Sequence, residues 1–258
     1  MQGPKNLLDT IEDVAARGEH IAVVRVLNVA SGKSAIVTVR HGQLFPPFAD
    51  RKLAEQILAV VRKVAKRGGV ADLVDGLDQQ GSPVKLAIEI IRPKLELVIF
   101  GAGHVGQAVA SIGALLGYHV TVVDDREEFA SRRRLPDPRI VLLVSDYASA
   151  AGKLTISSGT NAVIVTRGHQ YDEVCLKSVV RSNASYIGMI GSRRRVLSVF
   201  KKLTDEGFSE KDLQRVHAPI GLRIGARTPQ EIAVSILAEI IAHVNNPERE
   251  HKGEEDGI

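Results

Sequence analysis

Hydrophobic residues recur along the chain with two different periods, and the pattern changes near residue 93. Before that point, helical spacing at residues 7–15 and 53–64 alternates with β-branched runs at 21–26, 35–39 and 84–91. Asp50 precedes the second helical segment and is a favourable N-cap, whereas residues 75–83 are expected to form a loop. Arg92-Pro93-Lys94 then interrupts the pattern. We therefore predict a small α+β domain over residues 1–92.

From residue 95 onward, short apolar strands alternate with helical segments. Strands are expected at 95–100, 120–123, 140–144, 162–166 and 186–190, and helices at 103–117, 171–181 and 192–206. The strands are almost continuously Val, Ile and Leu, which is typical of a parallel sheet covered on both faces. Strands separated by helices are joined by right-handed crossovers. The pattern predicts a doubly wound, Rossmann-like α/β domain over residues 93–246.

The last helix of this domain has a strong start signal. Thr228 is an N-cap, Pro229 stands at the first helical position, and Glu231 completes a capping box. Apolar residues nearly encircle the helix as far as Val244, so we expect deep packing and a homodimer contact on the remaining surface. Residues 247–258 are expected to be a flexible acidic tail.

Composition narrows the functional classes. The net charge is 34 − 30 = +4, and the chain has no Trp and 4% aromatic residues, which leaves few platforms for stacking nucleic-acid bases. No apolar run approaches the roughly 20 residues that span a bilayer, and residues 1–6 lack the apolar core of a signal peptide. We expect a cytoplasmic protein that binds neither nucleic acid nor membrane. The single cysteine, Cys175, excludes an internal disulfide and stands where a buried small hydrophobe is expected.

The strongest local motif is a glycine turn between the strand at 95–100 and the helix that follows. Gly101 permits the tight turn, Gly103 lets phosphate oxygens approach the backbone, and Gly106 permits close packing of helix on strand. His104 either touches phosphate or faces solvent. Asp124 and Asp125 lie 23 and 24 residues after Gly101, where a carboxylate commonly binds a ribose diol.

The expected strand order 3-2-1-4-5 brings further residues to the same edge of the sheet. Thr166-Arg167-Gly168-His169 follows the fourth strand, next to the glycine turn. Gly191-Ser192-Arg193 follows the fifth strand and opens a helix whose N-cap is Ser192. With at least one arginine of the run 193–195, these segments predict a site for a ligand that carries several phosphates.

His169 and Asp172 are the candidates for chemistry. A loop imidazole with a carboxylate three residues later forms an oriented acid–base pair. The alternative is that Asp172 caps the helix and His169 only hydrogen-bonds a ligand. Two other segments are less specific. We interpret Arg132-Arg133-Arg134 as a solvated charged loop, and the apolar loop at 216–226 either closes a pocket, seats a partner or forms a packed connector.

The combined motifs resemble the XdhC/CoxI family of xanthine dehydrogenase accessory proteins. The matching segments are GAGHVG at 101–106, VDDR at 123–126, TRGH at 166–169, YIGMIGSRR at 186–194, HAPIGL at 217–222 and TPQEIA at 228–233. The resemblance implies a non-catalytic maturation factor that binds the molybdenum cofactor, as molybdopterin or its dinucleotide form, and assists its sulfuration. It also implies delivery to an apo-molybdenum hydroxylase of the xanthine or carbon monoxide dehydrogenase type, with a cysteine desulfurase as a further partner.

The first half of the chain departs from the family pattern. It lacks the Gly-Ser-x-Pro-Arg stretch near the first strands and the glycine-rich segment with a cysteine, because the sole cysteine falls in the second half. Two alternatives stay open on the residues alone. One is an NAD(P)-dependent oxidoreductase that uses His169 and Asp172 for proton transfer. The other is a nucleotide-sensing regulatory domain.

Overall fold

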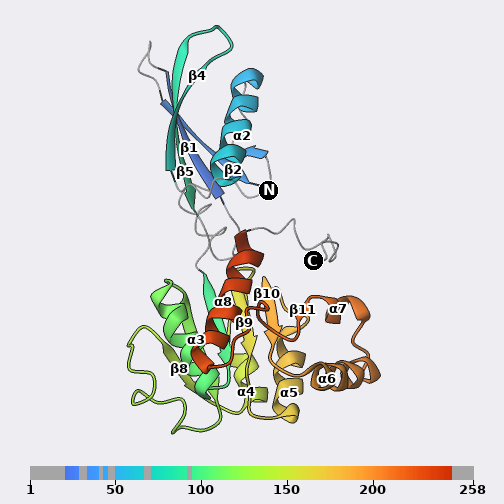
Figure 1. The fold of residues 1–258 in the computed structure, drawn as a ribbon. Coiled ribbons are helices and arrows are strands. Elements are labelled where there is room, and N and C mark those ends of the chain that lie inside the picture. Colours follow the sequence, from blue (N-terminus) through green and yellow to red (C-terminus); the bar gives the residue numbers. More distant parts are fainter. Residues whose placement is uncertain are drawn as a thin grey trace. The chain divides into compact units, whose positions relative to one another are not determined.

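The computed structural model describes residues 21–28, 34–40, 43–45, 50–66, 71–91 and 95–245, without the side chains of 34–37, 40, 66, 71, 151 and 169. The helix predicted at 7–15 and the tail predicted at 247–258 lie outside these residues. The chain divides into two compact units, Met1–Pro93 and Lys94–Ile258, and each is described by itself (Figure 1).

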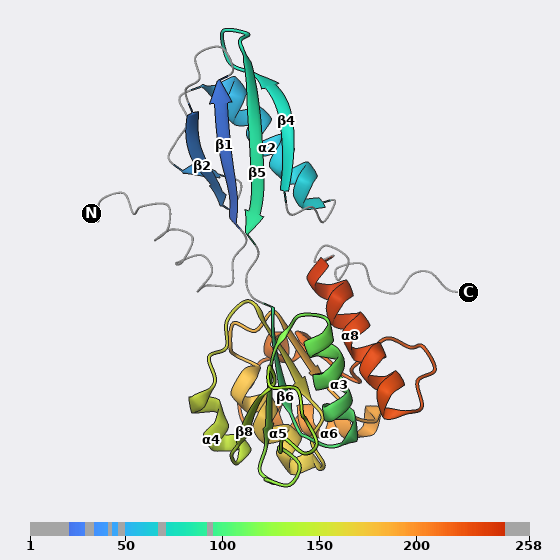
Figure 2. The same cartoon turned by 90° about the vertical axis from the view of Figure 1, so that its left-hand side faces the viewer.

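The described residues of the first unit form a five-stranded antiparallel sheet with a helix on one face (Figure 2). The order is β3-β2-β1-β5-β4, with β1 Ile21–Asn28, β2 Ser34–Arg40, β3 Gln43–Phe45, β4 Ala71–Leu77 and β5 Pro83–Ile91. Helix α2, Arg51–Lys66, begins after Asp50, whose Oδ1 accepts the Leu53 N–H at 2.9 Å. The predicted N-cap is confirmed.

Alternation of side chains explains how this sheet buries one face. In β5 every second residue is buried, from Val84 to Ile90, because successive side chains of a strand point to opposite faces. Leu53, Ile57 and Val61 of α2 recur at helical spacing and pack in the same apolar cluster. The period-2 pattern of the strand and the helical period of α2 therefore meet in one small core.

The loop prediction for residues 75–83 was wrong at both ends. Residues 75–77 belong to β4, which pairs with β5 from Ala71 to Leu77, and Pro83 begins β5. As an edge strand, β4 pairs on one side only and exposes Leu73 and Leu77. Its two aspartates and a glycine are poor strand formers, so no alternating pattern marks it in the sequence.

Residues 95–245, the described part of the second unit, form a six-stranded parallel sheet. The order is β11-β10-β9-β6-β7-β8, with β6 Glu96–Phe100, β7 His119–Asp124, β8 Val141–Val144, β9 Thr160–Ile164, β10 Tyr186–Met189 and β11 Val216–His217. Numbered within this unit, the order is 6-5-4-1-2-3, the Rossmann arrangement. The predicted fold class and strand order are confirmed.

Helices cover both faces of this sheet (Figure 1, Figure 2). Helices α3 His104–Leu115 and α8 Pro229–Asn245 pack side by side on one face; the other carries α4 Tyr147–Ala150, α5 His169–Val179 and α6 Arg193–Asp205. A short 3-10 turn, η1 Ala151–Lys153, follows α4, and α7 Glu210–Gln214 precedes β11. Leu97 and Ile99 of β6 join the α3–α8 cluster, whereas Val98 and Phe100 join the α5–α6 cluster.

Two connections differ from a regular helix crossover. The connection from β7 to β8, which is described throughout, contains turns and no helix, and it buries Ala130, Leu135 and Ile140 in the α3–α8 cluster. The segment at 216–226 adds β11 to the sheet. It then donates the Ile220 N–H to Met189 O at 3.0 Å and the Leu222 N–H to Ser235 O at 3.2 Å, so it packs as a connector. The prediction had no strand here.

The capping box of α8 is confirmed. Glu231 Oε2 accepts the Thr228 N–H at 3.0 Å, and Thr228 Oγ1 accepts the Glu231 N–H at 3.2 Å. Deep packing holds for one face of α8 only, since Val234 and Ile241 are 48% and 38% exposed. None of the helices in the described ranges has both the length and the apolar character required to cross a membrane.

Replacing the cap tests how much it stabilises α8. We expect Thr228→Ala to lower the free energy of unfolding of the second unit by about 1 kcal/mol, because a backbone N–H of the first turn loses its acceptor. Thr204→Ala, at an exposed position late in α6, is the matched control and should have no comparable effect. Urea denaturation followed by circular dichroism measures both, and equal losses would contradict the assignment.

Candidate functional site

Three turns leave neighbouring strands at one edge of the second sheet. Strands β6, β9 and β10 are adjacent and parallel, so their carboxyl ends lie together. The Val165 N–H donates to Phe100 O, and the Ile190 N–H donates to Ile164 O, both at 2.9 Å. The structure thus brings together the segments 101–106, 165–168 and 191–195. This edge is the crevice where doubly wound sheets bind ligands.

The first of these turns can be built only from glycine at two positions. Gly101 has φ +114°, and a Cβ there would lie 2.5 Å from Val165 O. A Cβ on Gly106 would lie 1.8 Å from Gly101 O. Gly103 is different, since a Cβ added to it meets nothing within 4 Å. The turn is therefore tight against β9 and open to incoming atoms above Gly103.

Two helices begin at this edge without a side-chain cap among the described residues. Gly103 precedes α3, which has no acidic residue in its first turn, and Gly168 precedes α5. Their first-turn N–H groups form a partially positive edge that favours anions. His104 is exposed on the first turn of α3. Helix α6 differs, because Ser192 Oγ accepts the Arg195 N–H at 3.3 Å.

Asp124, at the end of β7, is fully buried and both of its carboxylate oxygens accept hydrogen bonds from the protein. Oδ2 accepts the Ala102 N–H at 2.7 Å, and Arg126 donates to both oxygens, from Nε at 2.9 Å and Nη2 at 3.0 Å. Burial raises the pKa of Asp124, but the hydrogen bonds from Arg126 and Ala102 outweigh it, so the pKa lies below its ordinary value. Asp124 therefore ties the glycine turn to β7.

Asp125 and Arg167 form an ion pair above the end of β6. Arg167 Nη2 lies 2.8 Å from Asp125 Oδ2 and 2.8 Å from the Tyr171 hydroxyl, and its guanidinium stacks over the Tyr171 ring. Because β6 lies between β7 and β9 in the sheet, this pair spans the strand from which the glycine turn departs. Asp125 Oδ1 is buried and accepts no hydrogen bond from the described residues.

Asp172 has a structural partner that the sequence pattern did not reveal. It is fully buried and accepts a hydrogen bond of 2.5 Å from Thr166 Oγ1 and another of 2.5 Å from Arg195 Nε. Arg195 packs its stem against Gly191, where a Cβ would lie 3.2 Å from its Cδ. This buried ion pair joins the β9 turn, the first turn of α5 and the start of α6.

The remaining predicted site residues divide into two groups. Thr166, Gly191 and Ser192 take part in the local framework just described, whereas Arg193 is exposed at the first position of α6. The side chain of His169 lies outside the described part of the chain, so its pairing with Asp172 stays a prediction.

Sequence reasoning missed Arg126, the partner of Asp124, although it directly follows the two aspartates. It also missed Tyr147, whose buried hydroxyl has no hydrogen-bond partner among the described residues; burial raises its pKa. The Tyr147 ring packs edge-on against the Tyr171 ring, as an ordinary core residue does. Nothing in the local sequence pattern singles it out.

Comparison with known proteins identifies the family of the second unit. Residues 97–240 match the model of the XdhC Rossmann domain. The chain is 34% identical over 206 residues to Escherichia coli YqeB, a protein described as uncharacterized. It is 31% identical over 154 residues to a Bacillus subtilis protein described as a probable xanthine dehydrogenase subunit. It is 26% identical over 149 residues to the E. coli molybdenum cofactor insertion chaperone PaoD.

These matches cover 76%, 60% and 58% of the chain, but only 37%, 44% and 40% of the respective relatives. The chain thus spans less than half the length of these curated proteins. A crystal structure described as a xanthine dehydrogenase from Bacillus halodurans has a TM-score of 0.65 and 22% identity, over 94% of this chain and 67% of that one. That likeness supports the fold.

Two glycines of the turn allow a matched test of its geometry. We expect Gly106→Ala to lower the free energy of unfolding by about 3 kcal/mol, because the added methyl overlaps the Gly101 carbonyl and one backbone must shift. Gly103→Ala adds the same methyl into open space and should leave stability nearly unchanged. Thermal denaturation compares the two; a well-tolerated Gly106→Ala would contradict the close packing.

The Asp124 ion pair predicts a pH-dependent stability. We expect Asp124→Asn to lower the unfolding free energy at neutral pH by about 2 kcal/mol, because an amide cannot accept from Arg126 on both sides. The folded pKa of Asp124 is depressed, so its contribution is complete above the ordinary value of about 4 and is lost as pH falls through the folded pKa. The difference from wild type should therefore shrink below about pH 4.

Asp205→Asn, at the exposed end of α6, is the charge-matched control for this experiment. Urea denaturation across pH 3–7 measures all three proteins. A difference between wild type and Asp124→Asn that stays constant over this range would contradict the role of the carboxylate charge.

Proposed function

Because the chain belongs to the XdhC family, we propose that it binds the molybdenum cofactor, as molybdopterin or its dinucleotide form, and assists its maturation. The proposed recipient is an apo-molybdenum hydroxylase of the xanthine or carbon monoxide dehydrogenase type. Two relatives support this choice by their descriptions, a molybdenum cofactor insertion chaperone and a probable xanthine dehydrogenase subunit.

Two uncapped helix starts and an arginine lie at the same edge of the sheet, and this arrangement supports phosphate binding. The first turns of α3 and α5 present N–H groups without side-chain acceptors, and Arg167, in the turn directly before α5, pairs with Asp125. Phosphate groups are bound in this manner by helix N-termini and guanidinium groups. Every form of the proposed cofactor carries at least one phosphate, so its phosphate end suits this edge.

Two features of the described residues fit such a ligand. The space above Gly103 admits a phosphate close to the backbone, since a Cβ there would meet nothing within 4 Å. Asp125 Oδ1 lies 3.9 Å from Arg126 Nε but accepts no hydrogen bond from the described residues, and a hydroxyl or ring N–H of a ligand would satisfy it. The site therefore offers donors for phosphate and one acceptor for a neutral donor group.

The oxidoreductase alternative has less support. A dinucleotide-binding dehydrogenase uses the carboxylate at the end of the second strand for a ribose diol, but both oxygens of Asp124 already accept bonds from Ala102 and Arg126. Proton transfer by Asp172 is disfavoured too, because Arg195 and Thr166 hold its carboxylate. We infer a non-catalytic carrier, in which Asp124 and Asp172 position the binding turns.

The thiol of Cys175 is a poor candidate for holding molybdenum or sulfur. It is fully buried among the side chains of α5 and neighbouring strands, and burial raises its pKa, which suppresses the reactive thiolate. Cys175 is the only cysteine of the sequence. We therefore propose that the chain holds the cofactor through its phosphate end and that sulfur comes from a partner, a cysteine desulfurase.

Arg167 provides the direct test. We expect Arg167→Ala to raise the dissociation constant for molybdenum cofactor by about tenfold, because one charge-assisted hydrogen bond to phosphate is lost. Arg139→Ala is the matched control, since Arg139 also pairs with an aspartate, Asp137, but on the β7–β8 connection. Anaerobic equilibrium dialysis, with bound molybdenum determined by elemental mass spectrometry, measures the three proteins.

A wild-type protein that retains no cofactor would contradict the proposal, and so would equal losses in both variants. Titration with NAD and NADP tests the oxidoreductase alternative, which requires that the dinucleotide bind and that hydride transfer occur. Affinity capture from the native cell tests the partners, because recovery of a molybdenum hydroxylase is expected and its absence from cofactor-loaded samples would contradict delivery.

A further inference from the structure

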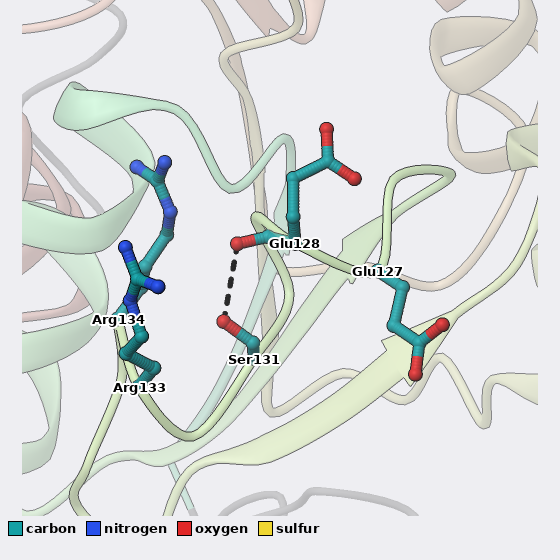
Figure 3. Close-up of a pocket in the computed structure, with 5 residues that line it drawn as sticks. All are labelled: Glu127, Glu128, Ser131, Arg133 and Arg134. Atoms are coloured by element: carbon teal, nitrogen blue, oxygen red, sulfur yellow. Dashed lines mark hydrogen bonds between the residues drawn. The ribbon is translucent and has the colours of Figure 1, made fainter.

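A pocket of about 440 Å³ lies in the connection between β7 and β8. It is lined by Glu127, Glu128, Ser131, Arg133 and Arg134 (Figure 3). The volume is within the range of small-molecule sites. The connection begins at Asp125, directly after the strand that Asp124 ties to the glycine turn. The pocket therefore belongs to the same edge of the sheet as the turn.

The walls of this pocket carry opposite charges. Figure 3 shows the guanidinium groups of Arg133 and Arg134 on one side and the Glu128 carboxylate on the other, with Ser131 between them and the Glu127 carboxylate directed away from the arginines. In the part of the chain that the structure describes, no ion pair joins these arginines to a carboxylate. The pocket thus offers unengaged donors and acceptors.

A stack of planar groups supports the arginine side of the pocket. The Arg134 guanidinium lies 4.3 Å from the centroid of the Phe129 ring, and the Arg126 guanidinium lies 3.7 Å from the same centroid. Phe129 belongs to the apolar cluster of α3 and α8. Arg126 is also held by Asp124, so Phe129 and Arg126 give the Arg134 guanidinium anchored neighbours. The charged loop expected at residues 132–134 is exposed at Arg132 and Arg133, and Arg133 and Arg134 also line the pocket.

We propose that this pocket binds the flat 2-amino-4-oxo-pyrimidine ring system that guanine and pterins share. The adjacent ring N–H and amino group of that system form a pair of donors, which a single carboxylate accepts side by side. The ring oxygen next to them is an acceptor for a guanidinium. Glu128 supplies the carboxylate, Arg133 the donor to the ring oxygen, and Arg134 a planar surface for stacking.

The charge balance of the pocket favours a neutral ring over a phosphate. Two arginines and two glutamates among the lining residues sum to zero, so a dianion gains little net attraction and meets carboxylates. Adenine is excluded for another reason. Its corresponding edge places a lone pair on N1 beside the amino group, and that lone pair would face the Glu128 carboxylate.

The assignment rests on the proposed function for the identity of the whole ligand, because the pterin of the molybdenum cofactor contains this ring system. In this assignment, two parts of the ligand bind at two places. The helix starts of α3 and α5 with Arg167 take phosphate, and the pocket at Glu128 and Arg134 takes the ring.

The test uses neutral probes, so that phosphate binding does not contribute. We expect guanosine and 6-hydroxymethylpterin to bind the full chain and adenosine to bind at least about tenfold more weakly, by calorimetric titration. Glu128→Gln should weaken both ligands about tenfold, since a carboxylate–donor pair becomes an amide with one repelling N–H. Glu210→Gln, at an exposed position of α7 outside the pocket, is the charge-matched control and should change either affinity less than about twofold.

Inorganic pyrophosphate tests the alternative hypothesis that the pocket binds an anion. An anion bound between Arg133 and Arg134 would bind more tightly to Glu128→Gln, whereas a ring would bind less tightly, so the direction of change decides. Pyrophosphate binding that Glu128→Gln strengthens, or adenosine binding as tight as guanosine binding, would overturn the assignment. Circular dichroism of each variant confirms that it is folded.

Failure of this assignment is separable from failure of the proposed function. If the protein retains molybdenum cofactor and Arg167→Ala weakens it, but Glu128→Gln changes neither probe, the ring binds elsewhere and the carrier role stands. If both probes bind in a Glu128-dependent manner and no cofactor is retained, the pocket is correctly assigned and the carrier role is wrong. If guanosine binds and the pterin does not, the ligand is a guanine nucleotide.

Discussion

The contact between the Asp124 carboxylate and the Ala102 N–H holds the proposed binding edge of the second unit together. It joins β7 to the turn that follows β6, across 22 residues of sequence, and it does so in a fully buried position. Arg126 supplies the compensating charge from the next connection. A buried carboxylate without such partners would be strongly unfavourable, so the turn, the aspartate and the arginine form one unit. The uncapped start of α3 is presented to solvent because this unit keeps the turn closed against β9.

A second buried carboxylate repeats the arrangement one strand further along. Asp172 is paired with Arg195 and hydrogen-bonded to Thr166, so the turns after β9 and β10 are fixed to each other as the turns after β6 and β7 are. Both aspartates are consumed by this internal role. The groups left toward solvent are backbone N–H groups, Arg167 and the exposed Arg193, which make the edge suited to anions. The buried carboxylates thus fix the turns, and the hydrogen-bond donors that remain face the solvent.

Much of the fold could be predicted because it depends on local pattern. The period change near residue 93, the glycine turn and the caps at Asp50 and Thr228 are all readable in short windows of sequence. The edge strands β4 and β11 were not predicted. Strand β4 contains polar residues and β11 has only two residues, so neither shows the alternation of apolar and polar positions that reveals a buried strand. The sequence indicated which segments meet at this edge of the sheet, but not which side chains pair there. Partners 22 and 23 residues apart, such as Ala102 with Asp124 and Arg195 with Asp172, become visible only when the strands are placed side by side. The run at 132–134 shows the same limit, because its neighbours Phe129 and Glu128 define a pocket only after the connection folds.

We propose above that the edge formed by residues 101–106 and 165–168 binds the phosphate end of the molybdenum cofactor. A crystal structure of the protein prepared anaerobically with that cofactor tests it most directly. We expect phosphate oxygens within hydrogen-bonding distance of the first-turn N–H groups of α3 and of the Arg167 guanidinium, with the Asp124–Ala102 contact intact. A cofactor held on another surface, with this edge unchanged and the Asp125–Arg167 pair undisturbed, would contradict it.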